Sequence, residues 1–429
     1  MTEIGEGVSV PPDPLSVDLG AEEPADEATS CTLERIKVRI SVFFDGTLNN
    51  RANTRYGQAN DPDFGQGSSS YHNELSNVAR LEEHVEEAPE YDYSTSIYVE
   101  GIATRDDRRD LRLGSAYGMW RTGVRAKVER GKNAAIRWLR RMVGEDVVVE
   151  TLTFDAFGFS RGAAAARNFI HVIREAYVDQ TFAGMTVEEL EFGFVGLYDT
   201  VASYGGNHGN DTEELQLDAV QHARFVLQLA AAEEYRENFP LTNIVSAPEG
   251  RQIYLPGSHS DVGGGYVDGG SEDKALCGAS GGSGRIEAEG LRRKVLAENW
   301  YRRDETRIVR RPSAHNRVDR YSLRVRREDI AKEYSYIPLH VMADFAIEHG
   351  MNIGEGLRRK FKIPSDLAPI KGTIDAHIAN NEASTPEHWQ GVWTIANFRH
   401  DYLHFSGSED IGMGVRFVDH RPEREVHEG

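Results

Sequence analysis

The sequence has only two cysteines, Cys31 and Cys277, and no run of about 18 apolar residues. Two cysteines are too few for a disulfide framework or a structural zinc site. The missing apolar run leaves no candidate for a membrane-spanning helix. The first residues, MTEIGEGVSVPPDP, lack the basic and apolar regions of a secretory signal. We therefore expect synthesis in the cytoplasm and, if the protein is exported, a route that needs no signal peptide.

Basic residues are also scarce. The 429 residues include 49 Lys and Arg against 69 Asp and Glu, which gives a formal net charge of −20. Such a chain is poorly suited to bind phosphate backbones, so no nucleic-acid partner is expected. Two segments, residues 105–141 and 292–327, are locally basic. They predict either solvated helix faces or a rim that meets phosphate headgroups.

Composition and pattern divide the chain into four segments. Residues 1–33 hold eight acids, four prolines and no Lys or Arg, a composition typical of a disordered tail. Residues 34–270 alternate strand and helix patterns, which predicts an α/β fold with a mostly parallel sheet and helices on both faces. Residues 271–335 are expected to be a Gly-rich and basic insertion, and residues 336–429 a region that packs on the core.

Within these segments the apolar patterns predict individual elements. Strands are expected at residues 35–44, 96–100, 147–157, 192–198 and 251–255, helices at residues 76–87, 122–142, 163–178, 213–238 and 338–350, and long loops at residues 51–75 and 263–290.

Residues 158–162, GFSRG, match the G-x-S-x-G pattern of a nucleophile elbow. An apolar strand precedes the motif and a small-residue helix follows it, which is the strand-turn-helix setting that the elbow needs. Ser160 is therefore the predicted nucleophile. In such a turn the backbone N–H of Arg161 is placed to bind an oxyanion.

A serine hydroxyl needs a base and an acid to become a good nucleophile. Asp199 ends one predicted strand, and His259 follows another. Residues just past the carboxyl ends of parallel strands converge on one crevice, so we expect both near Ser160. The chain order Ser, Asp, His is that of α/β hydrolases, and we interpret residues 34–270 as an α/β-hydrolase catalytic core. His259 is then the base, and Asp199 holds its tautomer and stabilises its charged form.

The turn at Asp45-Gly46-Thr47-Leu48 has competing interpretations. It resembles the end of the phosphatase signature D-x-D-G-T-L, but Phe43 stands where that signature has its nucleophilic Asp. In a hydrolase, the backbone N–H of Gly46 or Thr47 would supply the second oxyanion donor. Asp45 would then brace the turn.

The loop after His259 contains three consecutive glycines, which allow close approach of the backbone to substrate or shape the loop. Asp261 is expected to orient this loop through hydrogen bonds. A metal site would want more ligands nearby, so no metal and no cofactor is expected. His400 and His404 are predicted to be structural.

Four blocks together resemble the type VI secretion lipase effectors of the Tle class. They are FFDGTLNN at residues 43–50, FGFSRGA at 157–163, GLYDTV at 196–201 and PGSHSDVGGGY at 256–266. In that family the elbow Ser, the strand-end Asp and the loop His form the triad. Those roles fall on Ser160, Asp199 and His259.

The resemblance implies hydrolysis of glycerophospholipid esters, of phospholipase A type. It also implies delivery by a contractile injection apparatus to the periplasm or membrane of rival bacteria, a secretion spike protein as carrier and an immunity protein in the producer. Contact with the phospholipid membrane surface is expected to use the basic segments and an apolar lid around residues 200–245. Two alternatives stay open: a soluble carboxylesterase or thioesterase with the same triad, and a non-catalytic binding module on a hydrolase fold.

Overall fold

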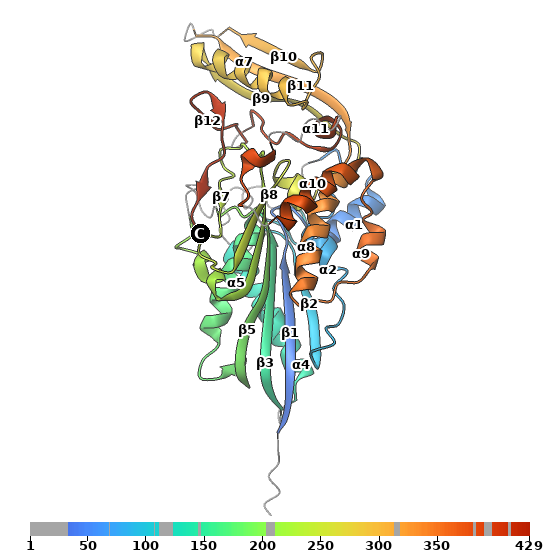
Figure 1. Cartoon of the computed structure of the whole chain (residues 1–429), viewed down its shortest axis with the longest axis vertical. Helices are drawn as coiled ribbons and strands as arrows, with labels where there is room; N and C mark the ends of the chain where they lie inside the picture. Colours follow the sequence, from blue (N-terminus) through green and yellow to red (C-terminus); the bar gives the residue numbers. More distant parts are fainter. Residues whose placement is uncertain are drawn as a thin grey trace, which may run out of the picture. The chain divides into compact units, whose positions relative to one another are not determined.

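The central sheet of the computed structural model has its strands in the order β2-β1-β3-β5-β6-β8, all parallel, with the short β4 antiparallel on β5 (Figure 1). The strands are β1 (Glu34–Phe44), β2 (Tyr93–Val99), β3 (Val147–Phe159), β4 (Thr181–Phe182), β5 (Met185–Tyr198), β6 (Ala223–Ala231) and β8 (Gly250–Leu255). This topology confirms the predicted α/β class with a mostly parallel sheet.

The structure describes residues 33–429 except for residues 68, 107, 111–122, 145–146, 203–210, 313–317, 381–382, 390–396 and 411–412. The expected acidic tail therefore lies outside the described residues, apart from Leu33. Residues Glu34–Gly429 form one compact unit. In the described part of this unit, no helix has both the length and the apolar character needed to cross a membrane.

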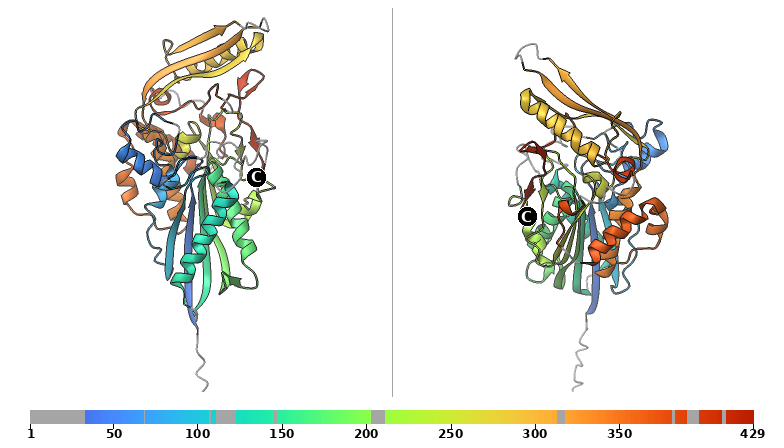
Figure 2. Two further views of the ribbon diagram at one scale, coloured as in Figure 1. Left: turned by 180° about the vertical axis from the view of Figure 1, so that it is seen from behind. Right: turned by 45° about the horizontal axis from the view of Figure 1, so that its top comes forward.

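Helices cover both faces of the sheet (Figure 2). On one face lie α4 (Val124–Met142) and α5 (Arg161–Ala176), and on the other lie α2 (Asn77–Glu82) and α8 (Tyr336–Glu348). Successive residues of β1 point to opposite faces, as the strand period requires. Phe43 stacks on Phe157 with ring centroids 4.4 Å apart, whereas Phe44 meets Phe169 of α5 at 5.5 Å on the other side.

The predicted helix at residues 213–238 is wrong. The segment instead forms a short 3-10 helix, η1 (Leu217–His222), followed by strand β6. β6 lies between β5 and β8 and is buried from Val226 to Ala231, so this part of its sequence is a mostly apolar run with Gln228 as the one polar residue. Such a run cannot be told from a buried helix by periodicity. The expected lid around residues 200–245 is also not a separate flap among the described residues, because β6 belongs to the central sheet.

Two predicted loops also contain regular structure. Residues 51–75 include α1 (Arg51–Asn60), whose first turn is capped by the Asn50 side chain. Residues 263–290 include β9 (Gly270–Ser280) and most of α7 (Gly281–Ala297). A Cβ at Gly284 would lie 2.3 Å from the Ala279 carbonyl oxygen, so this glycine allows the helix to lie against the strand. The glycines that suggested a loop serve close packing here.

β9, β10 (Thr306–Arg311) and β11 (Arg320–Ile330) form a three-stranded antiparallel sheet against which α7 packs. We refer to residues 270–330 as the β9–β11 module. It is tied to the chain that follows α11 (Phe398–Tyr402) by Arg327, which donates to the Leu403 carbonyl at 2.6 Å.

The remaining elements are short or lie near the end of the chain. They are α6 (His259–Gly263), α9 (Gly356–Lys360), α10 (Ala368–Ala379), η2 (Glu333–Ser335), η3 (Ser365–Leu367), β7 (Leu241–Thr242), β12 (Phe417–Val418), β13 (Arg421–Pro422) and β14 (Val426–His427).

Candidate active site

Ser160 sits at the sharp turn between β3 and α5. Its backbone has φ +60° and ψ −127°, a conformation that costs energy in a residue other than glycine. The Ser160 N–H donates to the Tyr198 carbonyl at 3.0 Å, and the Ser160 carbonyl accepts from the Ala163 N–H at 3.0 Å. These bonds hold the strained turn in place. A strained Ser between a strand and a helix is the geometry of a nucleophile elbow.

The two motif glycines are required by close packing. A Cβ at Gly158 would lie 2.3 Å from the Gly162 carbonyl oxygen. A Cβ at Gly162 would lie 2.3 Å from the Asp45 carbonyl oxygen. Larger residues at either position would force α5 away from β3 or from the end of β1.

Asp199 and His259 are in direct contact. Asp199 follows β5, and His259 opens α6 after β8. His259 Nδ1 lies 2.5 Å from Asp199 Oδ2, and both side chains are buried. A proton on Nδ1 shared with the carboxylate leaves Nε2 as the nitrogen that can accept a proton.

Aromatic packing places the imidazole beside the elbow. The ring of Phe159, the residue before Ser160, lies 4.6 Å from the His259 ring, and the Phe239 ring lies edge-on at 5.1 Å. Within the described residues the Ser160 hydroxyl makes no hydrogen bond, so its bond to His259 is not formed in this state. Catalytic hydrogen bonds often tighten only when substrate is bound.

The protonation states of the pair suit general-base chemistry. Burial lowers the pKa of His259, and the attraction of Asp199 opposes this only in part. Burial alone would raise the pKa of Asp199, but the nearby Arg424 and the hydrogen bond from His259 outweigh it and hold that pKa well below its usual range. Near neutral pH the carboxyl is therefore ionised and the imidazole is neutral.

A buried acidic pair holds the loop that carries His259. Glu233 accepts from the Gly257 N–H and pairs with Arg399, while Glu234 Oε2 accepts from the His259 N–H at 3.3 Å. Burial opposes ionisation of Glu234, but the adjacent Arg236 lowers its pKa to about 2. Sequence reasoning missed both acids because they fall in the segment interpreted as a helix. Their position directly after the apolar run of β6 was the available signal.

The three expected oxyanion donors lie in two neighbouring turns. The Arg161 side chain donates from Nε to Thr47 Oγ1 at 2.8 Å, which joins the first turn of α5 to the turn after β1. The Gly46 N–H donates to Asp45 Oδ1 at 2.7 Å and is therefore engaged. The Thr47 N–H donates to no described residue. Of the two alternatives in this turn, only the Thr47 N–H has no hydrogen-bond partner among the described residues, and its role as an oxyanion donor stays a prediction.

Asp45 is buried under the same turn. Its carboxylate also accepts from the hydroxyls of Ser76 and Tyr98, and burial raises its pKa despite these bonds. It therefore braces the turn in this structure. Phe43, at the position of the phosphatase nucleophile, is fully buried in the core, which leaves no phosphatase centre there.

Asp261 shapes the histidine loop from the other side. Its carboxylate accepts from the Ser258 N–H at 2.8 Å in a capping box at the start of α6. It also bonds His404 Nδ1 at 2.9 Å, and the His404 ring stacks on Tyr266 at 3.6 Å. His400 lies instead between Glu305 and Asp401.

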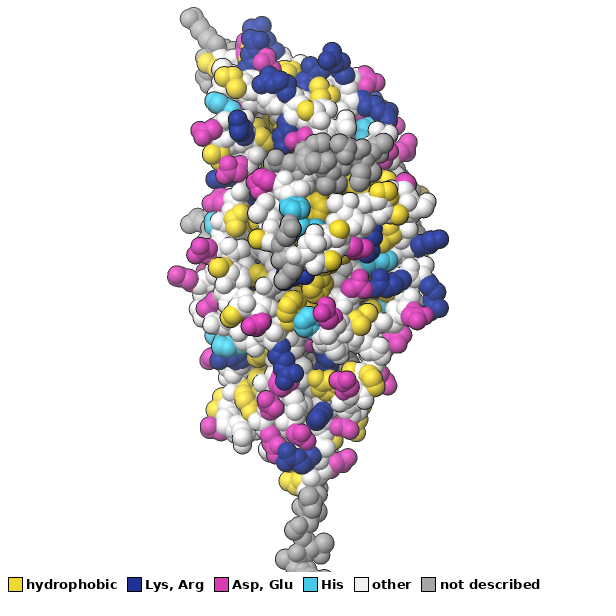
Figure 3. Space-filling model, in the orientation of Figure 1, with side chains coloured by type: hydrophobic (Ala, Val, Ile, Leu, Met, Phe, Trp, Pro, Cys, Tyr) yellow, Lys and Arg dark blue, Asp and Glu magenta, His cyan; other side chains and the backbone are white. Residues whose placement is uncertain are grey.

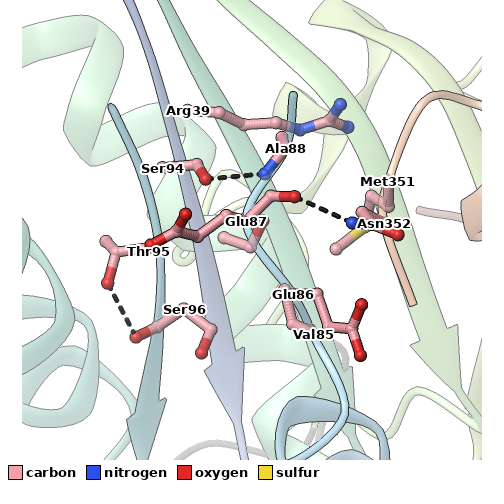
Figure 4. A pocket seen from close by; sticks show the side chains of 11 residues that line it. Arg39, Val85, Glu86, Glu87, Ala88, Ser94, Thr95, Ser96, Met351 and Asn352 are labelled. Carbon is pink, nitrogen blue, oxygen red and sulfur yellow. Dashed lines mark hydrogen bonds between the residues drawn. The ribbon is translucent and has the colours of Figure 1, made fainter. Parts of the chain in front are cut away.

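Among the described residues, no group of three or more His, Cys, Asp or Glu side chains is placed to hold a metal ion. A cavity of about 210 Å³ lies beside β1 and β2 (Figure 4). Its lining includes Arg39, Ser94 and Asn352 but none of the expected catalytic residues. The Ala88 N–H donates to Ser94 Oγ at 2.8 Å, and Asn352 Nδ2 donates to the Glu87 carbonyl at 2.8 Å, so these polar groups of the lining already bond to one another.

The chain was compared with known proteins. A family model described as "T6SS, Phospholipase effector Tle1-like, catalytic domain" matches residues 173–280, which include Asp199 and His259 but not Ser160. No curated protein matched the chain.

Two solved structures match the chain. "Structure of the Tle1 effector bound to the VgrG spike from the Type 6 secretion system" matches with a TM-score of 0.60 and 20% identity, over 92% of this chain and 94% of that chain. "Crystal structure of an uncharacterized protein from Pseudomonas aeruginosa" matches with a TM-score of 0.43 and 18% identity, over 82% of this chain and 52% of that chain. Residues 173–280 thus match the Tle1-like catalytic domain of type VI secretion phospholipase effectors, the family that the sequence blocks resemble, and the chain shares the fold of the Tle1 effector.

Proposed function

We propose that the protein is a serine phospholipase of the A type that hydrolyses acyl esters of glycerophospholipids. The observation that carries the proposal is the buried Asp199–His259 pair beside a strained elbow serine, Ser160. The match to a phospholipase effector domain supports the substrate class.

The proposed reaction has two steps. His259 Nε2 takes the proton of Ser160 as its Oγ attacks the ester carbonyl, and Asp199 stabilises the imidazolium that forms. The backbone N–H groups of Arg161 and Thr47 bind the oxyanion, helped by the positive end of the α5 dipole. Collapse releases the lysophospholipid, whose oxygen takes the proton from His259. Water, losing a proton to His259, then attacks the acyl carbonyl, and the bond to Ser160 Oγ breaks as His259 returns that proton to the serine oxygen, which releases the fatty acid.

The similar structure of the Tle1 effector also supports a proposal about how the protein is delivered. The Tle1 effector in the solved structure is bound to a VgrG spike. We infer that this chain is likewise carried by a spike protein to target cells, and that the producer holds an immunity protein against it. The proposed lipid substrate then lies in the membrane of the target cell, so the protein must bind that membrane surface.

The β9–β11 module supports contact with that surface. Lys and Arg side chains are frequent over it (Figure 3). In the sheet register Arg307 lies opposite Arg324 and Arg311 lies opposite Arg320. Arg307 and Arg311 are exposed and form no ion pair with a described residue. Basic side chains near an anionic leaflet contribute about 1 kcal/mol each.

The membrane contact is tested by binding to phosphatidylglycerol vesicles at increasing salt. Affinity should fall with salt, and Arg307→Gln with Arg311→Gln should weaken binding and flatten the salt dependence. The changes Arg359→Gln and Lys362→Gln, at two exposed residues outside both basic segments, together are the charge-matched control. Binding that does not respond to salt contradicts the electrostatic contact.

The chemistry is tested with a fluorophosphonate probe, which labels an activated serine. Intact mass should rise by one adduct in the wild type, and Ser160→Ala should stay unlabelled. An unlabelled wild type would favour the non-catalytic binding module. Turnover of soluble short-chain esters that does not rise when lipid aggregates form would favour the soluble esterase or thioesterase.

A further inference from the structure

Arg424, which lies 225 residues further along the chain, forms an ion pair with the carboxylate of Asp199. Its Nη1 donates to Oδ1 at 2.7 Å and its Nη2 donates to Oδ2 at 2.9 Å, a two-pronged ion pair. The side chains are 8% and 0% exposed. The guanidinium is itself fixed, since Nε donates to the Phe239 carbonyl at 3.0 Å.

Backbone pairing presents this arginine to the site. β14 runs parallel to β7, with Val426 opposite Leu241 and His427 opposite Thr242. The Leu241 N–H donates to the Glu425 carbonyl at 2.9 Å, directly beside Arg424. The position of Arg424 therefore follows from a two-stranded ladder outside the central sheet.

We propose that Arg424 is a positioning residue of the catalytic pair: its planar fork sets the orientation of the Asp199 carboxylate and, through it, of the His259 ring. This inference rests on the proposed function. Planar guanidinium groups match a carboxylate with two parallel bonds, which a lysine cannot do.

The remaining contacts of Asp199 explain why two hydrogen bonds from Arg424 are needed to fix its carboxylate. Oδ1 also accepts from the Ala231 N–H at 2.8 Å, and Oδ2 accepts from His259. Among the described residues, loss of Arg424 would leave each oxygen with one partner, so the carboxylate would be less firmly held about its Cβ–Cγ bond. A misplacement of about 1 Å in a catalytic group costs on the order of 10²-fold in rate.

Arg424 also contributes charge. The charged groups that act on the His259 ring include Asp199, Glu234 and Arg236, and Arg424 in turn acts on Asp199 and Glu234. Removing one positive charge near the imidazole makes protonation easier, so the pH at which the base loses activity should rise. A purely structural role for Arg424 would not move this pH.

The test compares Arg424→Gln, Arg424→Lys and Arg424→Ala with Arg421→Gln. Arg421 lies in the same segment, is exposed, and makes no side-chain contact with Asp199, so its change is charge-matched. We expect kcat on a soluble ester to fall on the order of 10²-fold in Arg424→Gln, with the acid limb of kcat/KM moved to higher pH. Arg424→Lys retains the positive charge, so the pH at which kcat/KM falls should lie nearer that of the wild type than in Arg424→Gln, but its kcat should stay below that of the wild type. Millimolar guanidinium, but not sodium, should restore activity to Arg424→Ala, and Arg421→Gln should stay within twofold of wild type.

The inference would be overturned if Arg424→Gln kept both the kcat of the wild type and its loss of kcat/KM at low pH. It would also be overturned if Arg424→Lys kept the full kcat. If Arg424→Gln does not fold, the lysine variant and guanidinium rescue decide the question, and absent rescue in a folded Arg424→Ala counts against it. Ser160→Ala separates the two levels. If Ser160→Ala is active, the proposed function itself is refuted. If Ser160→Ala is inactive but the variants at Arg424 have the activity and pH dependence of the wild type, only the inference about Arg424 is refuted.

Discussion

Substitution of Gly162 by alanine tests the geometry of the elbow. Gly162 lies in the first turn of α5, and an added Cβ would sit 2.3 Å from the Asp45 carbonyl oxygen and 2.4 Å from that of Phe44. Ordinary contact begins at 3.4 Å, so α5 and the end of β1 must separate by roughly 1 Å (3.4 − 2.3). The atoms in the way are backbone, so no side chain can swing aside.

That separation pulls apart the two turns that carry Arg161 and Thr47, the proposed oxyanion donors. A misplacement of about 1 Å costs on the order of 10²-fold in rate. We therefore expect Gly162→Ala to lose about 100-fold in kcat/KM, or roughly 2.7 kcal/mol of transition-state stabilisation. Overpacking should also lower the free energy of unfolding by about 1–3 kcal/mol.

The assay is stopped-flow hydrolysis of a soluble ester, scaled to the folded fraction from urea unfolding. Gly372→Ala is the matched control, because Gly372 is an exposed glycine of α10 whose Cβ would meet nothing within 4 Å. That variant should keep full activity and gain up to about 1 kcal/mol of stability. A folded Gly162→Ala with kcat/KM within threefold of wild type would refute the packing argument.

Three further outcomes follow from the charges in the structure. Asp199→Asn should lower kcat by roughly 10⁴-fold through loss of the correct His259 tautomer, and steady-state kinetics on the folded fraction would show a smaller loss if Asp199 had no such role. Because the pKa of His259 is lowered and the base must be neutral, kcat/KM should rise with pH to a plateau, with the midpoint of the rise below the ordinary histidine value of 6.5. A limb centred above 6.5 would count against this environment. Burial opposes ionisation of Glu272, but Arg327 lowers its pKa to about 2, so this pair stabilises the fold above about pH 4.5 and the contribution is lost as pH falls toward 2. Glu272→Gln should flatten the fall in urea midpoint over that range, and an unchanged slope would be inconsistent with the pair.

The strands that carry the proposed catalytic residues could be predicted from the sequence, because the residues that define them are neighbours along the chain. β3 and β5 end in apolar runs followed directly by Ser160 and Asp199, and the glycines around Ser160 report a tight turn. Parallel-strand topology then predicts that these strand ends meet.

Elements that depend on distant partners were not accessible. β6 has an apolar run that suits either a helix or a buried strand, and only its place between two strands decides the matter. Gly284 looked like a loop residue, yet it is used for helix–strand packing. The same holds for Arg424, because an ion pair spanning 225 residues leaves no pattern in its neighbouring sequence.

The most direct test of the account is fatty-acid release from mixed phospholipid vesicles by the wild type and by Ser160→Ala, measured side by side. The account predicts release by the wild type and none by the folded variant. Equal release by both would remove Ser160 from the mechanism, and no release by a wild type that still hydrolyses soluble esters would contradict the phospholipase assignment.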